Sequence, residues 1–585
     1  MNSSHWLFAR CRGHNQSIAV WAILFVHALL LARIAYINAP VFDEIAHLPA
    51  GLSHWKFGNF DLYRVNPPLM RMIASTPLLL INPQTDWSSI SDGPYARPEF
   101  VVGSKFMRAN GYESFWLFSI CRWAQIPVSM FGGWICFRWA RELFGPSSGF
   151  VALLLWSTCP NVLAWGSTIT PDNGAAAFGV AAAYAFWRWL KTPSWSAALI
   201  AGIAMGLAEL SKSTWIILFL LWPVLWFAWR CCIRTVVVPK PRVLQLVCLC
   251  LLGLYVLNLG YGLDGSFQRL GQFTFISQSL GGPDAHTAPG NRFRDSWIGS
   301  IPVPVPANYL RGIDIQKFDF EKGKWSYLRG EQKLGGWWYY YLYALAVKTP
   351  LGTLFLMGLT ILLLAISRGY SVKFRDEIVL LIPALTVLAV VSSQTGFNRY
   401  LRYVLPALPF LFIFASQSAK AFELKQRLPR LLCVISTMMA ILGSLLVFPH
   451  SMSYFNLVAG GPLGGPRHLL DANIDWGQDL LELKRFVDAH PEATPINLIY
   501  FGFADQKLAG FRAEPQSTLD NTVTRPNLTP GWYAISVNHL YGYRHYENDQ
   551  PTWTRFQHIA PDMMAGYSIY LYHMTAERLD RLNQQ

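Results

Sequence analysis

Apolar runs long enough to cross a membrane as helices recur along the first three quarters of this chain. A helix needs about 20 mostly apolar residues to span ~30 Å of hydrocarbon, where it satisfies its own backbone hydrogen bonds. We identify eleven runs, at residues 17–37, 115–137, 150–169, 173–190, 197–210, 214–229, 243–261, 351–366, 378–393, 403–416 and 431–447. Since 52% of the residues are hydrophobic and only 14% are charged, we expect a polytopic α-helical membrane protein.

The basic residues between these runs indicate an orientation. The formal net charge is +14, and Lys and Arg collect in alternate connections. These connections contain Arg10 and Arg12; Arg138 and Arg141; Arg188 and Lys191; Arg230, Arg234, Lys240 and Arg242; Arg368, Lys373 and Arg375; and Lys420, Lys425, Arg427 and Arg430. The positive-inside rule then predicts a cytoplasmic N-terminus, in a bacterial inner or plasma membrane. No nucleic-acid-binding module is visible, so we expect membrane lipids and no nucleic acid as partners.

The opposite, extracytoplasmic face receives most of the polar sequence. We predict a multi-span membrane domain, 1–449, with large loops at 38–114 and 262–336, and an extracytoplasmic C-terminal domain, 450–585. Within that last segment, 473–489 has helical spacing, whereas 496–501, 532–537 and 568–572 alternate as short strands do. This pattern predicts a small α+β fold.

Charged residues of both signs stand at the outer ends of the apolar runs. Asp43 and Glu44 follow the first run, where a solvated pair is the plain alternative, and Asp172 follows the third. Further charges occur in Gly206–Lys212, in Lys348-Thr349-Pro350 and in Asn398–Tyr403. Charges at a membrane boundary on one face predict a functional site. Carboxylates can activate a hydroxyl group, and Arg or Lys can bind a phosphate.

These motifs, in this order, resemble the GT-C glycosyltransferases, and within them glycosyltransferase family 39. That family includes protein O-mannosyltransferases and the aminoarabinose transferases of lipid A. The resemblance runs from about residue 17 to 447. It is carried by Asp43-Glu44, Pro67-Pro68-Leu69, Thr170-Pro171-Asp172, Gly-Leu-Ala-Glu-Leu-Ser-Lys (206–212) and Arg-Tyr-Val-Leu-Pro-Ala-Leu-Pro (402–409).

The resemblance implies a GT-C-like fold that transfers a hexosyl or pentosyl group. The donor would be a polyprenyl-phosphate sugar, and the acceptor a protein, lipid or glycan on the extracytoplasmic face. By position, Asp43 matches the catalytic acidic residue, Glu44 would orient it or help hold a metal or the acceptor, and Asp172 joins the site. The candidates for binding the donor phosphate are Arg402, Arg399, Lys212, Lys348 and Arg122.

Structural alternatives exist for several of these residues. Lys212 and Lys348 could snorkel from helix ends to lipid headgroups, and Arg402 could be an interfacial anchor. Asp172 could instead cap the following helix.

One departure from the family affects substrate and metal binding. Many members have His where this chain has Asn66, before Pro67-Pro68-Leu69. We therefore take Asn66 and the nearby His47 as candidate substrate-binding residues. No cofactor is certain; a divalent cation remains an open alternative.

The segment 471–482 places oxygen-bearing side chains at five positions of an EF-hand loop. However, Trp476 stands where that loop needs Gly, and Gly477 follows one residue later. We therefore favour acids that cap the next helix, or that contact a glycan beside Trp476, over a calcium site.

Two other functional classes compete with an enzyme. A secondary transporter should show inverted repeats with charges at the membrane midplane, whereas these charges collect at one face. A glycan-binding scaffold would need far fewer spans for anchoring.

Overall fold

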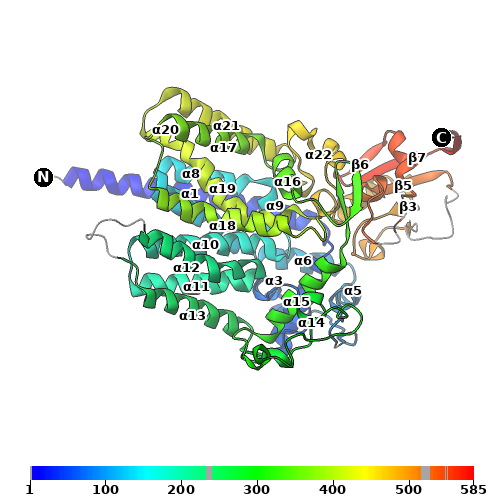
Figure 1. Cartoon of the computed structure of the whole chain (residues 1–585). Coiled ribbons are helices and arrows are strands. Elements are labelled where there is room, and N and C mark those ends of the chain that lie inside the picture. The colour runs from blue at the N-terminus through cyan, green and yellow to red at the C-terminus, as the bar shows by residue number, and fades with distance from the viewer. Residues whose placement is uncertain are drawn as a thin grey trace.

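The computed structural model describes residues 3–91, 93–231, 240–515, 528–546, 549 and 551–584. It is mostly helical, and its long helices lie side by side in one bundle (Figure 1). The N-terminal end of α1 lies at one end of this bundle, and a β-sheet formed by the last part of the chain lies at the other (Figure 1). Short helices from the long connections gather at the sheet end.

The bundle is built from the segments that the apolar runs predicted, except that the run at 115–137 is divided between α6 (Glu113–Trp123), outside the bundle, and α7 (Ile126–Phe144). Its helices are α1 (Ser3–Ile37), α7 (Ile126–Phe144), α8 (Pro146–Thr158), α9 (Pro160–Gly166), α10 (Pro171–Lys191), α11 (Trp195–Ser211), α12 (Leu218–Cys231), α13 (Val243–Gly260), α17 (Leu351–Ile366), α18 (Phe374–Ser393), α19 (Leu408–Ala415), α20 (Lys420–Glu423) and α21 (Arg427–Leu445). The 3₁₀ helix η1 (Ser213–Ile217) leads into α12, and η4 (Leu401–Ala407) and η5 (Ser416–Ala419) lie directly before and after α19.

Six described helices are long and apolar enough to cross a membrane, or up to eight segments if each bent pair is one span. The bent pairs are α8 with α9, at 55°, and α16 with α17, at 110°. The protein is thus a multi-pass integral membrane protein, but the predicted count of eleven is not confirmed. The shortfall has a physical reason: α11 has only 17 residues, and α7 carries Arg138, Arg141 and Glu142 near one end.

Three of the expected basic connections, those with Arg138, Arg188 and Arg375, meet in space. Arg138 and Arg188 both pair with Glu142, at 3.2 and 4.0 Å, and Trp187 donates to Asp376 at 2.7 Å. Arg234 lies outside the described residues. Which side of a membrane this end faces stays a prediction.

The connections at the sheet end form a layer of short helices. They are α2 (Glu44–Phe57), α3 (Leu69–Ser75), α4 (Leu78–Ile81), α5 (Glu99–Asn110), α6 (Glu113–Trp123), α14 (Gln278–Gly281), α15 (Ala307–Lys322) and α16 (Tyr340–Lys348), with a hairpin of β1 (Trp325–Leu328) and β2 (Glu331–Leu334). Helix α5 crosses α2 closely at Gly103, where a Cβ atom would lie 2.1 Å from the carbonyl oxygen of Ile45. Only glycine permits so close a contact. It holds α5 against α2, the helix that begins directly after Asp43.

The C-terminal segment from residue 450 onward, called the tail below, forms a mixed five-stranded sheet of order β4-β3-β5-β7-β6. Its strands are β3 (Ile496–Ile499), β4 (Ala513–Pro515), β5 (Gly531–Ser536), β6 (Met563–Ala565) and β7 (Ile569–Met574). Strand β3 is parallel to β4 and β5, while β7 is antiparallel to β5 and β6. The remaining helices of the tail are α22 (Gly461–Gly464), α23 (Leu480–Ala489), α24 (Val537–Leu540) and α25 (Ala576–Gln584).

The three predicted strands are present as β3, β5 and β7, whereas the helix expected from residue 473 begins only at Leu480. One hydrophobic cluster joins Leu480 and Phe486 of α23 to Ile45 of α2 and Phe118 of α6. The tail therefore packs directly on the connections of the bundle. The domain boundary at 449/450 stays a prediction.

Candidate functional site

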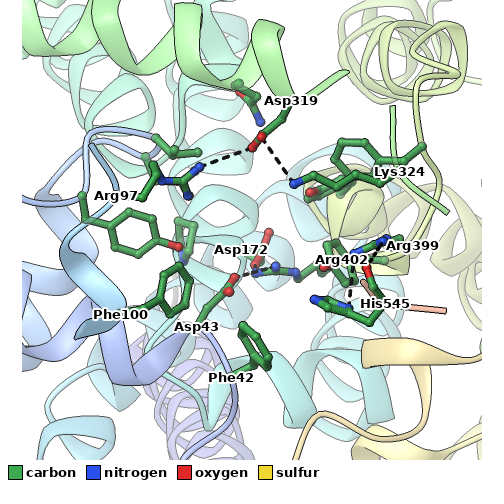
Figure 2. Close-up of a pocket in the computed structure, with 18 of the residues that line it drawn as sticks. Phe42, Asp43, Arg97, Phe100, Asp172, Asp319, Lys324, Arg399, Arg402 and His545 are labelled. Carbon is green, nitrogen blue, oxygen red and sulfur yellow. Dashed lines mark hydrogen bonds and ion pairs between the residues drawn. The ribbon is translucent and has the colours of Figure 1, made fainter. Parts of the chain in front are cut away.

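A cavity of about 380 Å³ opens at the sheet end of the bundle, and most of the charged motifs meet there. Its walls come from the segment after α1, the start of α10, the end of α11, helix α15, the segment before η4 and the tail. Figure 2 shows Asp43, Asp172 and Arg402 on its inner side, with Arg97, Asp319 and Lys324 across from them. The size suits a small-molecule ligand.

Arg402 lies at the centre of the charged side chains on the inner side of the cavity. Its Nη2 donates to Asp43 Oδ2 at 2.7 Å and its Nη1 to Asp172 Oδ2 at 3.2 Å, and Lys212 Nζ donates to the other oxygen of Asp172 at 2.5 Å. The side chain of Asp43 is 18% exposed and that of Asp172 only 1%. Asp43 is thus the carboxylate that a substrate in the cavity can reach.

Local structure explains why these residues converge. Asp172 lies in the first turn of α10, where the helix dipole favours a carboxylate, and Thr170 occupies the N-cap position. The alternative of Asp172 as the N-cap is therefore wrong. Lys212 ends α11 and is buried with its ammonium on Asp172, so it does not snorkel to headgroups.

Arg402 also lies among aromatic rings. Its guanidinium carbon is 4.5 Å from the ring centre of Trp476 and 4.6 Å from that of Tyr400, with Trp165 and Tyr403 further out. The whole residue is only 5% exposed. Such an enclosed guanidinium is not an interfacial anchor. A guanidinium can bind an oxyanion through two N–H groups at once, but here both Nη atoms already donate to carboxylates, so an oxyanion would have to displace one of them.

Arg399 and Asn66 also line the cavity. Arg399 directs its donors toward the tail and the hairpin: Nη2 to the carbonyl of His545 and Nε to that of Trp325, both at 2.9 Å. The backbone carbonyl of Asn66 accepts a hydrogen bond from Arg71, which holds this residue at the cavity wall.

Four predicted site residues, Glu44, His47, Arg122 and Lys348, lie outside the cavity lining. Arg122 donates to Glu44 through Nε and Nη2, and to the carbonyls of Ala35, Asn38 and Ala39. The side chains of Arg122 and Glu44 are both 0% exposed. All five guanidinium N–H groups are used, so Arg122 has none left for a phosphate, and Glu44 braces the turn before Asp43.

Lys348 is likewise buried, with its ammonium on the carbonyls of Met452 and Asn473 rather than at the cavity or at headgroups. Lys348 therefore lies outside the cavity that Arg399, Arg402 and Lys212 line.

His47 lies behind Tyr63, with ring centres 4.4 Å apart, and not on the cavity wall. Burial, followed by the positive charges of Arg71 and Arg402, holds the pKa of His47 well below its ordinary value. A neutral, enclosed imidazole does not match the substrate contact that we expected.

The segment after Leu470 does not form an EF-hand. The left-handed turn is made by Gly477, at φ 88°, and the acids point to different partners. Asp471 accepts from Tyr543, Asp475 from the N–H of Gly477, and Asp479 from Ser568. Asp479 does occupy the N-cap position of α23, as expected, but its side chain makes no capping hydrogen bond. Trp476 is 1% exposed, so the expected glycan contact beside its ring is wrong.

The sequence did not decide whether the protein holds a divalent cation. Within the described ranges, no three His, Cys, Asp or Glu side chains are grouped so that they could hold a metal ion. Asp43 and Asp172, the two carboxylates of the inner cavity, face Arg402 and Lys212 instead.

Several lining residues were not predicted. Among them are Arg97, Gln316, Asp319 and Lys324, together with Phe503, His545 and Tyr546 of the tail. Asp319 lies 3.6 Å from Arg97 and 3.4 Å from Lys324 across the mouth of the cavity (Figure 2). They occur singly in long polar segments, where no spacing connects them, so no sequence signal could have found them.

A second, apolar cavity of about 270 Å³ adjoins the first. Its walls include Ile216 and Ile217 of η1, Phe320 of α15, and Val390 and Val391 of α18. Lys212, Gln316 and Tyr403 line both cavities. A charged pocket thus continues into an apolar groove between η1 and α18.

Comparison with known proteins adds a family to this geometry. Residues 117–255 match the family described as dolichyl-phosphate-mannose-protein mannosyltransferase. This match supports a glycosyltransferase family with the GT-C fold. The matched part contains Asp172 and Lys212 but neither Asp43 nor Arg402. No curated protein matches the chain significantly.

Among solved structures, the chain is similar to ArnT from Cupriavidus metallidurans bound to undecaprenyl phosphate. The identity is 11% and the TM-score 0.44, over 94% of this chain and 97% of that one. It is also similar to the Archaeoglobus fulgidus oligosaccharyltransferase in complex with Zn and sulfate, at 12% identity and a TM-score of 0.43, over 91% and 71% of the two chains. Both TM-scores are low, so no conclusion about this chain rests on them.

Proposed function

We propose that the protein transfers a sugar from a polyprenyl-phosphate carrier to an acceptor on the extracytoplasmic face. The observation that carries this proposal is the junction of the two cavities at Lys212, Gln316 and Tyr403. A lipid-linked sugar needs a polar place for sugar and phosphate and an apolar place for the chain, side by side. The family match supports the same chemistry.

Arg402 and Lys212 are the proposed phosphate-binding groups. A guanidinium can engage two phosphate oxygens at once, and an ammonium can add a point charge beside it. In this structure Asp43 pairs with Arg402, and Asp172 pairs with both Arg402 and Lys212. A donor phosphate on Arg402 would compete with Asp43, which would leave this carboxylate free beside the sugar.

Asp43 is the proposed general base. The acceptor oxygen forms a bond to the anomeric carbon, while the bond from that carbon to the phosphate oxygen breaks. The acceptor proton passes to Asp43, and the bonding electrons leave with the polyprenyl phosphate, whose charge Arg402 and Lys212 stabilise. The sugar type and the acceptor are set by the outer cavity wall, where Asn66, Arg97, Asp319 and Lys324 stand.

The direct test uses purified protein in detergent with polyprenyl-phosphate mannose and polyprenyl-phosphate aminoarabinose, plus an extract of envelope lipids, glycans and proteins. Release of polyprenyl phosphate and labelling of an acceptor, with at least one donor, are expected. No release above a boiled control with either sugar would reject the proposed donor class for these sugars.

The proposed orientation has its own test. A reporter fused after Gln585 should be active only outside the cytoplasm, and a reporter inserted beside Lys240 only inside it. A cytoplasmic reporter signal after Gln585 would contradict an extracytoplasmic site.

A further inference from the structure

The tail segment 473–478 contacts the chain beside both proposed inner groups of the cavity. Asp43 and Arg402 are 359 residues apart in sequence. The backbone next to each of these two residues forms hydrogen bonds with this segment, which lies behind the cavity wall. From these contacts we infer that the segment is a positioning element, which sets Asp43 and Arg402 relative to each other.

On the arginine side, Asn473 is the main contact. Its Oδ1 accepts from the N–H of Leu401 at 3.0 Å, and its Nδ2 donates to the carbonyl of Arg399 at 2.7 Å. The side-chain amide of Asn473 thus holds the backbone just before Arg402 with both its oxygen and its nitrogen. Asn473 is 2% exposed, so these bonds are shielded from water.

On the carboxylate side, the backbone of the same segment provides the contact. The N–H of Phe42 donates to the carbonyl of Trp476 at 3.2 Å, and that of Ala39 to the carbonyl of Gln478 at 2.8 Å. The turn that ends in Asp43 is therefore bonded to the segment by two hydrogen bonds.

Trp476 joins the two sides. Its carbonyl holds Phe42, while its ring lies 4.5 Å from the guanidinium carbon of Arg402. Trp476 is 1% exposed and does not line the cavity. It acts through Arg402 and is thus a positioning residue.

The segment is itself held from behind. Lys348 donates to the carbonyl of Asn473, Tyr500 to that of Gly477 at 2.6 Å, and Asn538 to that of Asp475 at 2.9 Å. Tyr500 follows β3 and Asn538 follows β5, so the sheet supports the segment. This assigns Lys348 and the tail a role in the site without contact to substrate.

This inference rests on the proposed function for its catalytic consequence, because Asp43 and Arg402 are its proposed groups. Reaction rates are sensitive to ångström errors in the placement of such groups, with losses of about 10²-fold. The placement itself can be measured without any substrate.

The test compares Trp476→Leu and Asn473→Ala with Trp476→Phe, which keeps an aromatic face under Arg402. Trp553→Leu is the matched control, since Trp553 is also 1% exposed and packs on Tyr533 and Phe556 in the tail. Within the described residues, the indole N–H groups of Trp476 and Trp553 both have no hydrogen-bond partner.

The first readout is hydrogen exchange of full-length protein in detergent. Trp476→Leu and Asn473→Ala should speed exchange in both peptides, 38–47 and 399–407, by roughly tenfold or more, whereas Trp553→Leu should not. Unchanged exchange in either peptide would overturn the inference, even if the proposed activity is absent.

The second readout is transfer with the polyprenyl-phosphate sugar that the wild type accepts. Per folded molecule, Trp476→Leu should lose about 10²-fold in kcat, and Trp476→Phe less than about tenfold. Equal losses in Trp476→Leu and Trp553→Leu at equal folded fraction would reduce Trp476 to a structural role and contradict the inference. A wild type inactive with every donor would count against the proposed function alone.

Discussion

Two neighbouring carboxylates, Asp43 and Glu44, each pair with an arginine, and the two pairs differ in what surrounds them. Asp43 meets Arg402 at a cavity, with side chains 18% and 7% exposed. Glu44 meets Arg122 at 2.6 Å, with both side chains fully enclosed. The chemistry of the pairs is the same, but only the first keeps an accessible carboxylate and a guanidinium that a ligand could engage. Residue type alone does not separate a pair that lies at a cavity from a pair that is fully enclosed.

The difference follows from the number of partners. Glu44 accepts from Arg122, from the N–H of Val41 and from the N–H of Ile169. These hydrogen bonds hold the turn after α1 against Ile169, in the segment that follows α9. The enclosed pair therefore stabilises the fold that presents the open pair.

The largest expected effect sharpens this comparison at the open pair. Asp43→Asn should lower transfer by about 10²–10⁴-fold, because the amide cannot accept the acceptor's proton. The purified variant should elute and melt as the wild type does, since Asp43 is partly exposed. Turnover of the polyprenyl-phosphate sugar measures the loss, and full activity would remove Asp43 from the mechanism.

At the enclosed pair we expect a loss of stability. Glu44→Gln leaves the Arg122 charge buried without a carboxylate, which should destabilise the protein by about 3–5 kcal/mol. The thermal midpoint and the yield of monodisperse protein in detergent report this. An unchanged midpoint would mean that the pair is not a structural brace.

A smaller effect is expected from Arg402→Lys, which keeps the charge but not the planar pair of donors. It should raise the donor KM and lower kcat, with a combined loss of roughly tenfold or more. Arg402→Ala should lose more. Unchanged donor dependence in the Lys variant would move the phosphate role to Lys212 or Arg399.

The smallest effect concerns the apolar groove next to the open pair. Val391→Trp should narrow the groove and raise the KM for a long-chain donor by roughly tenfold, with less effect on a short-chain analogue. Titration of both donors checks this. Equal effects on the two donors would contradict a lipid chain in this groove.

Much of the fold was predictable because hydropathy and charge act locally. The apolar runs located the bundle helices, and the alternating pattern located β3, β5 and β7. The number of spans was harder to predict, since buried helices such as α7 tolerate charges and α11 is short.

The sequence motifs located four residues that the structure brings to one cavity, Asp43, Asp172, Lys212 and Arg402, while their roles stay a proposal. Sequence could not separate these from Glu44, Arg122 and Lys348, because partners such as the carbonyls of Ala35 and Met452 leave no pattern in the chain. The contribution of His545, Phe503 and Trp476 depends on how the tail packs, which no local signal encodes.

The central claim is that Asp43 takes part in the transfer reaction, whereas Glu44 stabilises the fold that presents it. The most direct test is kcat per folded molecule for Asp43→Asn and Glu44→Gln, measured side by side with the same polyprenyl-phosphate sugar in the same detergent. The account predicts a loss of about 10²–10⁴-fold in Asp43→Asn and less than about tenfold in Glu44→Gln. Equal losses, or the larger loss in Glu44→Gln, would contradict it.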